Sequence, residues 1–249
     1  MTDKFKDHFS QVSREYRVFR PEYPEELFLW LARIAPQQDA ALDCGCGTGQ
    51  AAVALARHFE KVWAVDPSAE QIANAVNDKK VTYMVAPAEK TGLPPASQDL
   101  VIAAQALHWF DLDRFYPEVR RIARHEAVFA AFSYGLVTID PAMDNVITYL
   151  YHDILGRYWP PERRHVDEGY RTLPFPFREI TTPEFAMTAD WELNHLLGYL
   201  ATWSAVKQFR AQTDADPLHV VKEELRTAWG PEKVKTIAWP LAIRAGIIT

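Results

Sequence analysis

The chain has 249 residues, a length that suits one large domain or a domain with a sizeable insertion better than two independent folds. Hydrophobic residues make up 48% and charged residues 24% of it, which excludes a disordered, collagen-like or coiled-coil chain. The 27 Lys and Arg against 33 Asp and Glu give a net charge of −6, and no basic run is long enough to follow a phosphate backbone, so binding to nucleic acid or to a membrane surface is disfavoured.

The first half of the chain predicts strands that alternate with helices. We expect helices over 27–34, 51–59, 68–76 and 112–122, and strands over 40–44, 62–65, 81–85, 100–104 and 127–132. Ser68 and Gln71 stand at capping-box spacing and mark one helix start, whereas Pro117 is expected to kink the last helix or to mark its first turn. This alternation predicts an α/β fold with a parallel sheet covered on both faces, whose ligands bind at the carboxyl ends of the strands.

Beyond Ser133 the alternation weakens, and the chain becomes rich in Pro, Tyr, Trp and Arg. Apolar residues at helical spacing over 143–155 and 193–203 predict two helices, which we interpret as part of an insertion. The last apolar stretch, 237–243, is expected to return to the sheet as an edge strand, where Pro240 would be tolerated.

Two cysteines, Cys44 and Cys46, are the whole cysteine content of the chain. They are too few and too close together to staple a secreted fold, and the first 20 residues lack the continuous apolar stretch of a secretory signal, so we expect a cytoplasmic protein. No stretch approaches the length that spans a bilayer. A lone Cys-x-Cys also lacks the ligand spacing of a structural zinc site, and we expect no metal.

The most informative segment is residues 41–50, ALDCGCGTGQ, where a strand runs through three alternating glycines into a helix. Gly45 and Gly47 have no Cβ and let a ligand approach the backbone, and the following helix exposes its amide end. A dinucleotide fingerprint would need a third glycine at position 50, where this chain has Gln50. That mismatch counts against NAD or FAD.

Two carboxylates accompany the loop. Asp43 lies two residues before the first glycine, where it would repel a phosphate but attract an ammonium group. Asp66 ends the next strand, a position from which a carboxylate can accept hydrogen bonds from both hydroxyls of a ribose, although it could instead be a plain turn residue. A ligand with a cationic amino-acid end and an adenosine end satisfies both, and S-adenosylmethionine is that ligand.

With this D-x-G-x-G-x-G pattern the chain resembles the class I S-adenosylmethionine-dependent methyltransferases over about residues 42–132. The resemblance implies a doubly wound, mostly parallel, seven-stranded Rossmann-like sheet with a helical cap or insertion. It also implies a set of cofactor contacts along the strand ends. These are Asp43, Gly45, Gly47 and Gly49 for the methionine part, Asp66 and Pro67 for the ribose, Ala88 and Glu89 beside the adenine, and Gln105 near the sulfonium.

Three segments are similar to the trans-aconitate methyltransferase group: Tyr16 with RPEYP at 20–24, ALHWF at 106–110 and LATWS at 200–204. Tyr16, Arg20 and Tyr23 lie upstream of the first strand, where they either cover the sheet edge and the opening helix or form a lid that closes over the cofactor. The position of 105–110 beside the expected sulfonium favours His108 as a base, with Trp109, Tyr23, Tyr134 and Trp203 around the substrate, although His108 and Trp109 could be ordinary packing residues. We expect one domain over 1–249, with the lid over 1–26 and, over 133–230, a cap or insertion that also contains late elements of the sheet.

The expected function is transfer of a methyl group to a small-molecule acceptor, with S-adenosylhomocysteine as the product. A carboxylate acceptor would need no base. Arg163, Arg164 and Arg171 are interpreted as a solvated face, or alternatively one of them pairs with such a carboxylate. The alternatives are a non-catalytic S-adenosylmethionine-binding protein and a macromolecular methyltransferase, the latter opposed by the lack of an Asn/Asp-Pro-Pro-Tyr motif and of a basic domain. A monomer or a homodimer is expected.

Overall fold

The structure is a computed structural model that describes Phe19 and residues 21–249. Its strands are β1 (Ala40–Cys44), β2 (Lys61–Asp66), β3 (Val81–Val85), β4 (Gln98–Ala104), β5 (Ala123–Tyr134), β6 (Arg178–Ile180), β7 (Ala186–Trp191) and β8 (Lys235–Ile247). Its α-helices are α2 (Glu25–Ile34), α3 (Gln50–Ala56), α4 (Ala69–Ala73), α5 (Leu112–Ile122), α6 (Pro141–Tyr149), α7 (Arg163–Asp167), α8 (Leu193–Ala201), α9 (Ser204–Thr213) and α10 (Pro217–Trp229). Shorter helical turns are η2 (Leu107–Trp109), η3 (Leu150–Ile154) and η4 (Gly156–Tyr158).

The sheet has the strand order β3-β2-β1-β4-β5-β8-β6, and β7 pairs with β8 outside this path. Strands β1 to β5 pair in parallel, and β8 is antiparallel to its neighbours. The predicted mostly parallel, Rossmann-like α/β sheet is therefore confirmed. Because β1 to β5 run in the same direction, their carboxyl ends meet at one edge of the sheet, where the glycine loop also lies.

The prediction that 237–243 forms an edge strand is wrong, because β8 lies between β5 and β6. Lys235–Pro240 pairs with β7, whereas Leu241–Ile247 pairs with β5. Pro240, which has no N–H to donate, falls where the strand changes partner. An interior strand can therefore carry this proline without interrupting its ladder with β5.

The helices begin near their predicted positions but are shorter in places. Ser68 Oγ accepts a hydrogen bond from Gln71 N at 3.3 Å, as the capping spacing predicts, yet α4 ends at Ala73 instead of reaching Val76. Helix α5 has the predicted bounds, with Pro117 inside it. None of the helices that the structure describes is long and apolar enough to cross a membrane.

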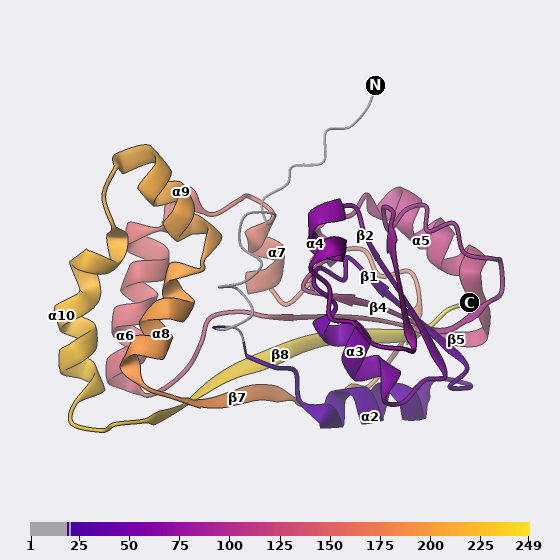
Figure 1. Ribbon diagram of the computed structural model, residues 1–249, viewed down its shortest axis with the longest axis horizontal. Helices are drawn as coiled ribbons and strands as arrows, with labels where there is room; N and C mark the ends of the chain where they lie inside the picture. The colour runs from indigo at the N-terminus through magenta and orange to yellow at the C-terminus, as the bar shows by residue number, and fades with distance from the viewer. Residues whose placement is uncertain (1–18, 20) are drawn as a thin grey trace.

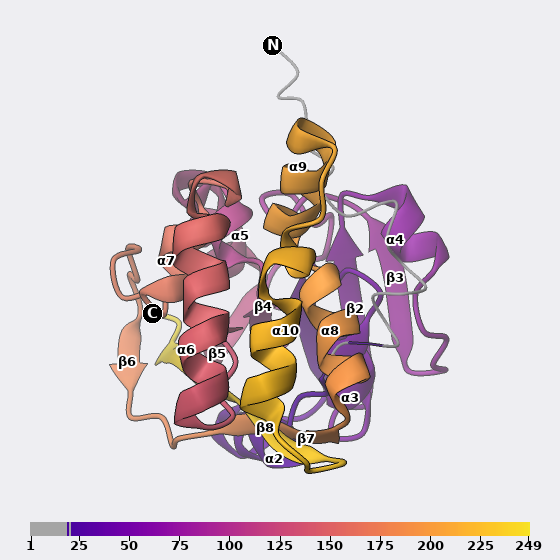
Figure 2. The same ribbon diagram turned by 90° about the vertical axis from the view of Figure 1, so that its left-hand side faces the viewer.

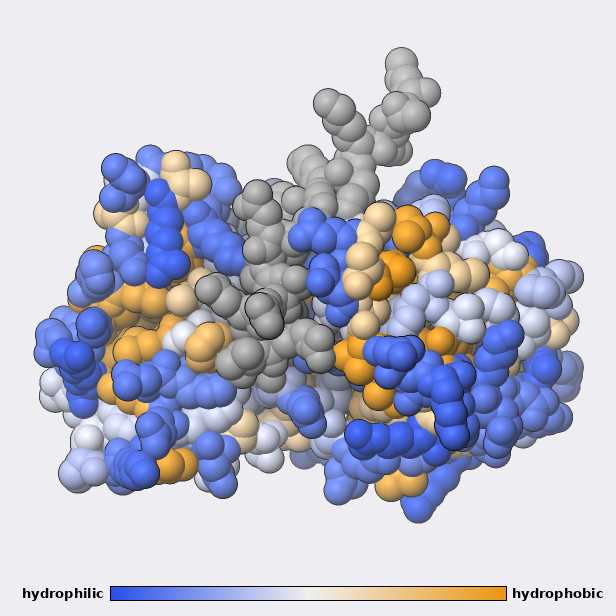
Figure 3. All heavy atoms as spheres, viewed as in Figure 1, coloured by the Kyte–Doolittle hydropathy of each residue, from blue (hydrophilic) through white to orange (hydrophobic). Residues whose placement is uncertain are grey.

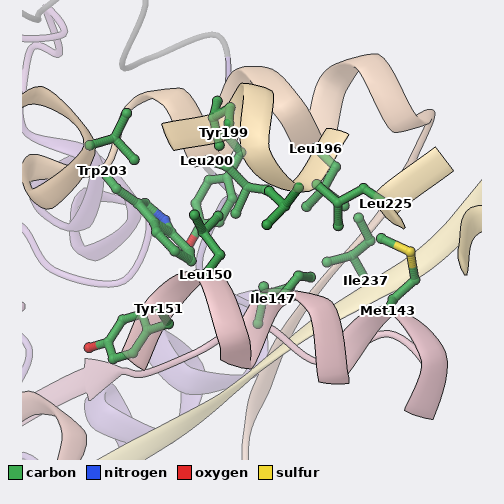
Figure 4. Packing of buried hydrophobic residues seen from close by; sticks show 14 of the residues in the cluster. Met143, Ile147, Leu150, Tyr151, Leu196, Tyr199, Leu200, Trp203, Leu225 and Ile237 are labelled. Atoms are coloured by element: carbon green, nitrogen blue, oxygen red, sulfur yellow. The ribbon is translucent and has the colours of Figure 1, made fainter. Parts of the chain in front are cut away.

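Figure 1 shows the parallel strands with α2 to α5 at one end of the molecule and a group of helices, α6, α8, α9 and α10, at the other. Strands β7 and β8 run from one part to the other, and Figure 2 looks onto α6 and α10 in front of the sheet. Buried apolar residues form one cluster on each face of the sheet and a third among the helices, where α6, α8 and α10 pack on the far half of β8 (Figure 4). On the face seen in Figure 3, polar residues cover most of the surface.

Candidate cofactor site

The glycine loop after β1 is pinned to the end of β2 by its backbone. Gly45 N and Cys46 N both donate to Val65 O, at 2.8 and 3.0 Å. The glycines at 45, 47 and 49 have φ angles of 69°, 53° and 85°, a left-handed conformation that residues with a Cβ seldom adopt. The alternating glycines therefore allow a tight turn directly into α3.

The three glycines differ in what surrounds them. A Cβ at Gly45 would lie 2.6 Å from the Cβ of Ala106, and one at Gly49 would overlap the Tyr83 hydroxyl. A Cβ at Gly47 would have its nearest contact among the described residues at 4.0 Å. Gly45 and Gly49 are thus required by packing within the protein, and Gly47 is the position of the three that leaves room for a ligand.

Asp66 organises the loop from the end of β2. Its Oδ2 accepts from Gly47 N and its Oδ1 accepts from Ser68 N, both at 2.9 Å, and the residue is 8% exposed. Pro67 follows in the same turn and is half-buried. The carboxylate predicted to bind the ribose is therefore also the group that positions the amide of Gly47, a role that the sequence did not reveal.

Asp43 is completely buried in β1, and neither carboxylate oxygen has a hydrogen-bond partner of ordinary geometry among the described residues. Burial, and then the nearby charge of Asp66, raise the pKa of Asp43 to about 7. The backbone N–H of Ala52 is close enough to lower the pKa of Asp43, but it is the weakest of the influences on that group. A buried, unpaired carboxylate beside a second carboxylate is costly unless a cation lies close to it. The cationic methionine end of S-adenosylmethionine meets that requirement, so the residues present fit this cofactor.

The loop after β3 lies beside Asp66, because Ala86 N donates to Asp66 O at 3.1 Å. Ala88 is buried, and Glu89 Oε1 accepts from Asp111 N at 2.8 Å, just before α5. The structure thus brings Ala88 and Glu89 to the same strand ends as the glycine loop. Their contact with the adenine stays a prediction.

Gln105 has a φ of 54°, which is unusual for a residue that is not glycine. Its backbone N donates to Phe132 O at 2.8 Å, and its side-chain Nε2 donates to Tyr134 O at 2.9 Å. These two bonds hold the chain after β4 against the end of β5. Gln105 therefore fixes the turn that leads to η2.

His108 lies in η2 with Nδ1 3.0 Å from the hydroxyl of Tyr170, and its ring is 4.7 Å from that of Trp109. Burial first, and then the electrostatic effects of Arg163 and His165, lower the pKa of His108 to about 3. The imidazole is therefore neutral at physiological pH and only weakly basic. Its partner Tyr170, fully buried with a φ of 61°, was not singled out by the sequence.

Three of the residues predicted to contact substrate, Tyr23, Tyr134 and Trp203, lie in or against the same hydrophobic cluster. Tyr23 packs on Phe132 and Tyr134, with ring centroids 5.2 and 6.4 Å apart. Trp203 is 5% exposed and lies in the helical cluster with Tyr199 (Figure 4), which indicates a packing role. Tyr16 and Arg20 lie outside the described residues.

The described part of the chain contains no group of three or more His, Cys, Asp or Glu side chains that could hold a metal ion. Cys44 and Cys46 are both free thiols. Of the two, Cys44 is buried, and burial raises its pKa well above the usual value, so it has the character of a small packing residue.

Comparison with known proteins gives consistent matches. A family described as "Methyltransferase domain" matches residues 42–131. A Dictyostelium discoideum protein named as a methyltransferase is 35% identical over 246 residues, which cover 96% of this chain and 94% of that protein. CRG1 of Saccharomyces cerevisiae, named as an S-adenosylmethionine-dependent methyltransferase, is 30% identical over 171 residues, covering 64% and 59%. A solved structure from Anaeromyxobacter dehalogenans, described as a type II methyltransferase, has a TM-score of 0.88 and 57% identity over 92% of this chain and 98% of that one.

Proposed function

Because the chain belongs to the S-adenosylmethionine-dependent methyltransferases, we propose that it moves the methyl group to a small-molecule acceptor. The observation that carries this proposal is the set of side chains around η2. His108 lies against Trp109 and the buried Tyr170, and α7 packs against the same turn. An aromatic surrounding of this kind suits a small, partly apolar molecule better than a polyanion.

The trans-aconitate methyltransferase group is the part of the family that we propose as nearest, on the segments 106–110 and 200–204. The first of these forms η2 and its flanks, and the second joins α8 to α9. Two free cysteines in the described structure agree with a reducing, cytoplasmic location, which we also propose. We also propose that the protein acts as a monomer or as a homodimer.

In the proposed reaction, S-adenosylmethionine supplies a methyl group on a cationic sulfur, and attack by the acceptor breaks the C–S bond with the electron pair left on sulfur, giving S-adenosylhomocysteine. The contribution of the protein is to hold the acceptor in line and to exclude water. Gly47, Asp43 and Asp66 would hold the cofactor. His108 would orient the acceptor.

The low basicity of His108 favours an acceptor that is already ionised. An imidazole with a pKa of about 3 removes a proton poorly from a phenol or an ammonium group at neutral pH. A carboxylate needs no such proton transfer. We therefore propose a carboxylate oxygen as the methylated atom, in preference to a phenol, amine or carbon acid.

The direct test of the proposed function supplies labelled S-adenosylmethionine to the purified protein with a panel of small acids, phenols and amines, and separately with RNA and a protein extract. Label is expected in the small acids. Label in RNA or protein, with none in any small molecule, would overturn the proposal.

Replacing His108 by Gln is expected to lower turnover about tenfold and to leave the affinity for S-adenosylhomocysteine unchanged, because the residue orients the acceptor and does not hold the cofactor. Turnover of the unmodified protein should show no inflection between pH 6 and 8 from this group, since its pKa lies far below that window. The measurement is the pH profile of turnover for both proteins. His125→Gln, an exposed histidine on β5, is the control, and an inflection near pH 6.5 lost only in His108→Gln would contradict this account.

A further inference from the structure

Arg163, the first residue of α7, stands apart from the other arginines of its region. Its side chain is 23% exposed, whereas the neighbouring Arg164 is exposed. Nε donates to Tyr151 Oη at 2.7 Å and to Asp167 Oδ1 at 3.2 Å, and the guanidinium lies 5.1 Å from the centroid of the Trp159 ring. The solvated face expected for these arginines therefore suits Arg164, and not Arg163.

The edge of the Arg163 guanidinium that carries its two terminal nitrogens is not used in these contacts. Neither terminal nitrogen makes a hydrogen bond or an ion pair with any other described residue. The single carboxylate on Arg163 is Asp167, which also accepts a hydrogen bond from Tyr151 Oη at 2.7 Å. A half-buried guanidinium thus retains the two donors that form a fork.

Arg163 lies in the same region as His108. Helix α7 packs against η2, the turn that carries His108. The segment after α7 returns to the same turn, because Tyr170 N donates to His165 O at 2.7 Å and the Tyr170 hydroxyl lies 3.0 Å from His108 Nδ1. The charge of Arg163 is also close enough to lower the pKa of His108.

Apart from Asp167, the buried groups that face Arg163 and η2, namely Tyr151, Tyr170 and His108, are uncharged at neutral pH. Burial raises the pKa of the hydroxyls of Tyr151 and Tyr170, and it lowers that of His108. Neutral aromatic walls around a cation cannot compensate its charge, and Asp167 is partly exposed and shared with Tyr151. An anion that enters here would gain two charge-assisted hydrogen bonds in a region of low polarity.

We propose that Arg163 binds a carboxylate of the acceptor beside η2, and so selects small carboxylic acids against their neutral analogues. The inference rests on the proposed small-molecule function and names its substrate class. In a monocarboxylic acid the carboxylate would be held and methylated at the same group, one oxygen on the guanidinium and the other attacking. In a dicarboxylic acid, one carboxylate would bind Arg163 and the other would accept the methyl group.

The test uses protein saturated with S-adenosylhomocysteine and a panel of aliphatic and aromatic mono- and dicarboxylic acids, each paired with its primary amide. Thermal shift and calorimetry are measured for the unmodified protein, Arg163→Met, Arg163→Lys and the control Arg164→Met. The unmodified protein and Arg164→Met should bind at least one acid and not its amide. Arg163→Met should lose about 30-fold or more in affinity for that acid, and Arg163→Lys should lose less.

Asp167→Asn keeps the inference testable if Arg163→Met fails to fold, because it leaves Arg163 in place and removes only the carboxylate that compensates its charge. This variant should bind the acid at least as tightly as the unmodified protein. Equal affinity of acids and amides, no acid bound by the unmodified protein, or no loss in a folded Arg163→Met would each overturn the inference. Methylation of neutral small molecules would overturn this inference and the proposed carboxylate acceptor, while leaving the transfer of methyl groups to small molecules intact. Methylation of RNA or protein alone would defeat the proposed small-molecule function itself.

Discussion

Replacing Asp43 by Asn is expected to stabilise the ligand-free protein by about 2 kcal/mol at pH 8 and to weaken S-adenosylhomocysteine binding about 100-fold. The carboxylate is fully buried without a hydrogen-bond partner of ordinary geometry among the described residues, and its pKa is raised from 3.8 to about 7. A shift of that size corresponds to up to about 4 kcal/mol of lost stability once the group is ionised. An amide in the same place is also unsatisfied, and its desolvation removes part of the gain.

The sign of the pH dependence follows from the direction of the shift. Between the unfolded pKa near 3.8 and the folded pKa near 7, the folded protein keeps a proton on Asp43 that the unfolded chain has lost. The contribution of Asp43 to stability is therefore fully present below pH 4 and is lost as the pH rises through 7. The gain from Asp43→Asn should accordingly be near zero at pH 4 and largest at pH 8.

Chemical denaturation of ligand-free protein at pH 5 and pH 8 checks this prediction, with calorimetry for the ligand. Asp113→Asn, which changes an exposed aspartate in the first turn of α5, is the matched control and should alter neither property. A variant that is less stable than the parent at pH 8 would show that Asp43 has a stabilising partner, and would contradict our interpretation of it.

Gly47→Ala and Gly45→Ala are expected to differ in the property that they impair most: ligand affinity for Gly47→Ala and stability for Gly45→Ala. Gly47→Ala should cost only about 1 to 2 kcal/mol of stability, from its positive φ, and should reduce the affinity for S-adenosylhomocysteine about 100-fold, because the new Cβ enters the space left for the ligand. Gly45→Ala should cost roughly 3 kcal/mol or more, because its Cβ also meets Ala106 at 2.6 Å. Denaturation and calorimetry on the two variants separate folding from binding.

Gly92→Ala serves as the control, since Gly92 also has a positive φ and no atom of the described residues lies within 4 Å of its added Cβ. It should share the small stability cost of Gly47→Ala and keep the parent affinity. Unchanged ligand affinity in Gly47→Ala would remove Gly47 from the cofactor site.

The parallel half of the fold follows from local patterns. Strands β1 to β5 and the start of α4 lie where apolar runs and the Ser68 cap predict them, since each depends on neighbours in sequence. The position of β8 does not follow from local patterns, because its partners β5 and β7 are remote in sequence. An apolar run of this kind also has the same sequence pattern in an edge strand and in an interior strand. Late sheet elements are expected within 133–230, but the positions of the short strands β6 and β7 could not be predicted for the same reason.

The site divides in a similar way. The cofactor-binding candidates Asp43, the three glycines and Asp66 could be predicted from the sequence, because they lie in one short segment and at the end of the next strand. Tyr170 could not, because its role arises from its contact with His108 and no local motif marks it. The sequence offered Arg163 together with Arg164 and Arg171 as a possible partner of a carboxylate, but could not choose among the three. A half-buried arginine and a solvated one have the same sequence signal. Only the packing of α7 distinguishes Arg163 from Arg164.

The central claim is that the loop held by Asp66 binds S-adenosylmethionine, and calorimetric titration tests it most directly. The protein and its Asp66→Ala variant are titrated with S-adenosylmethionine, S-adenosylhomocysteine and, as a control, NAD. Both sulfur ligands should bind the unmodified protein with about micromolar affinity, NAD should not bind, and the variant should lose about 100-fold because the Gly47 amide is no longer held. Binding of NAD in their place, or equal affinity in the variant, would contradict the account.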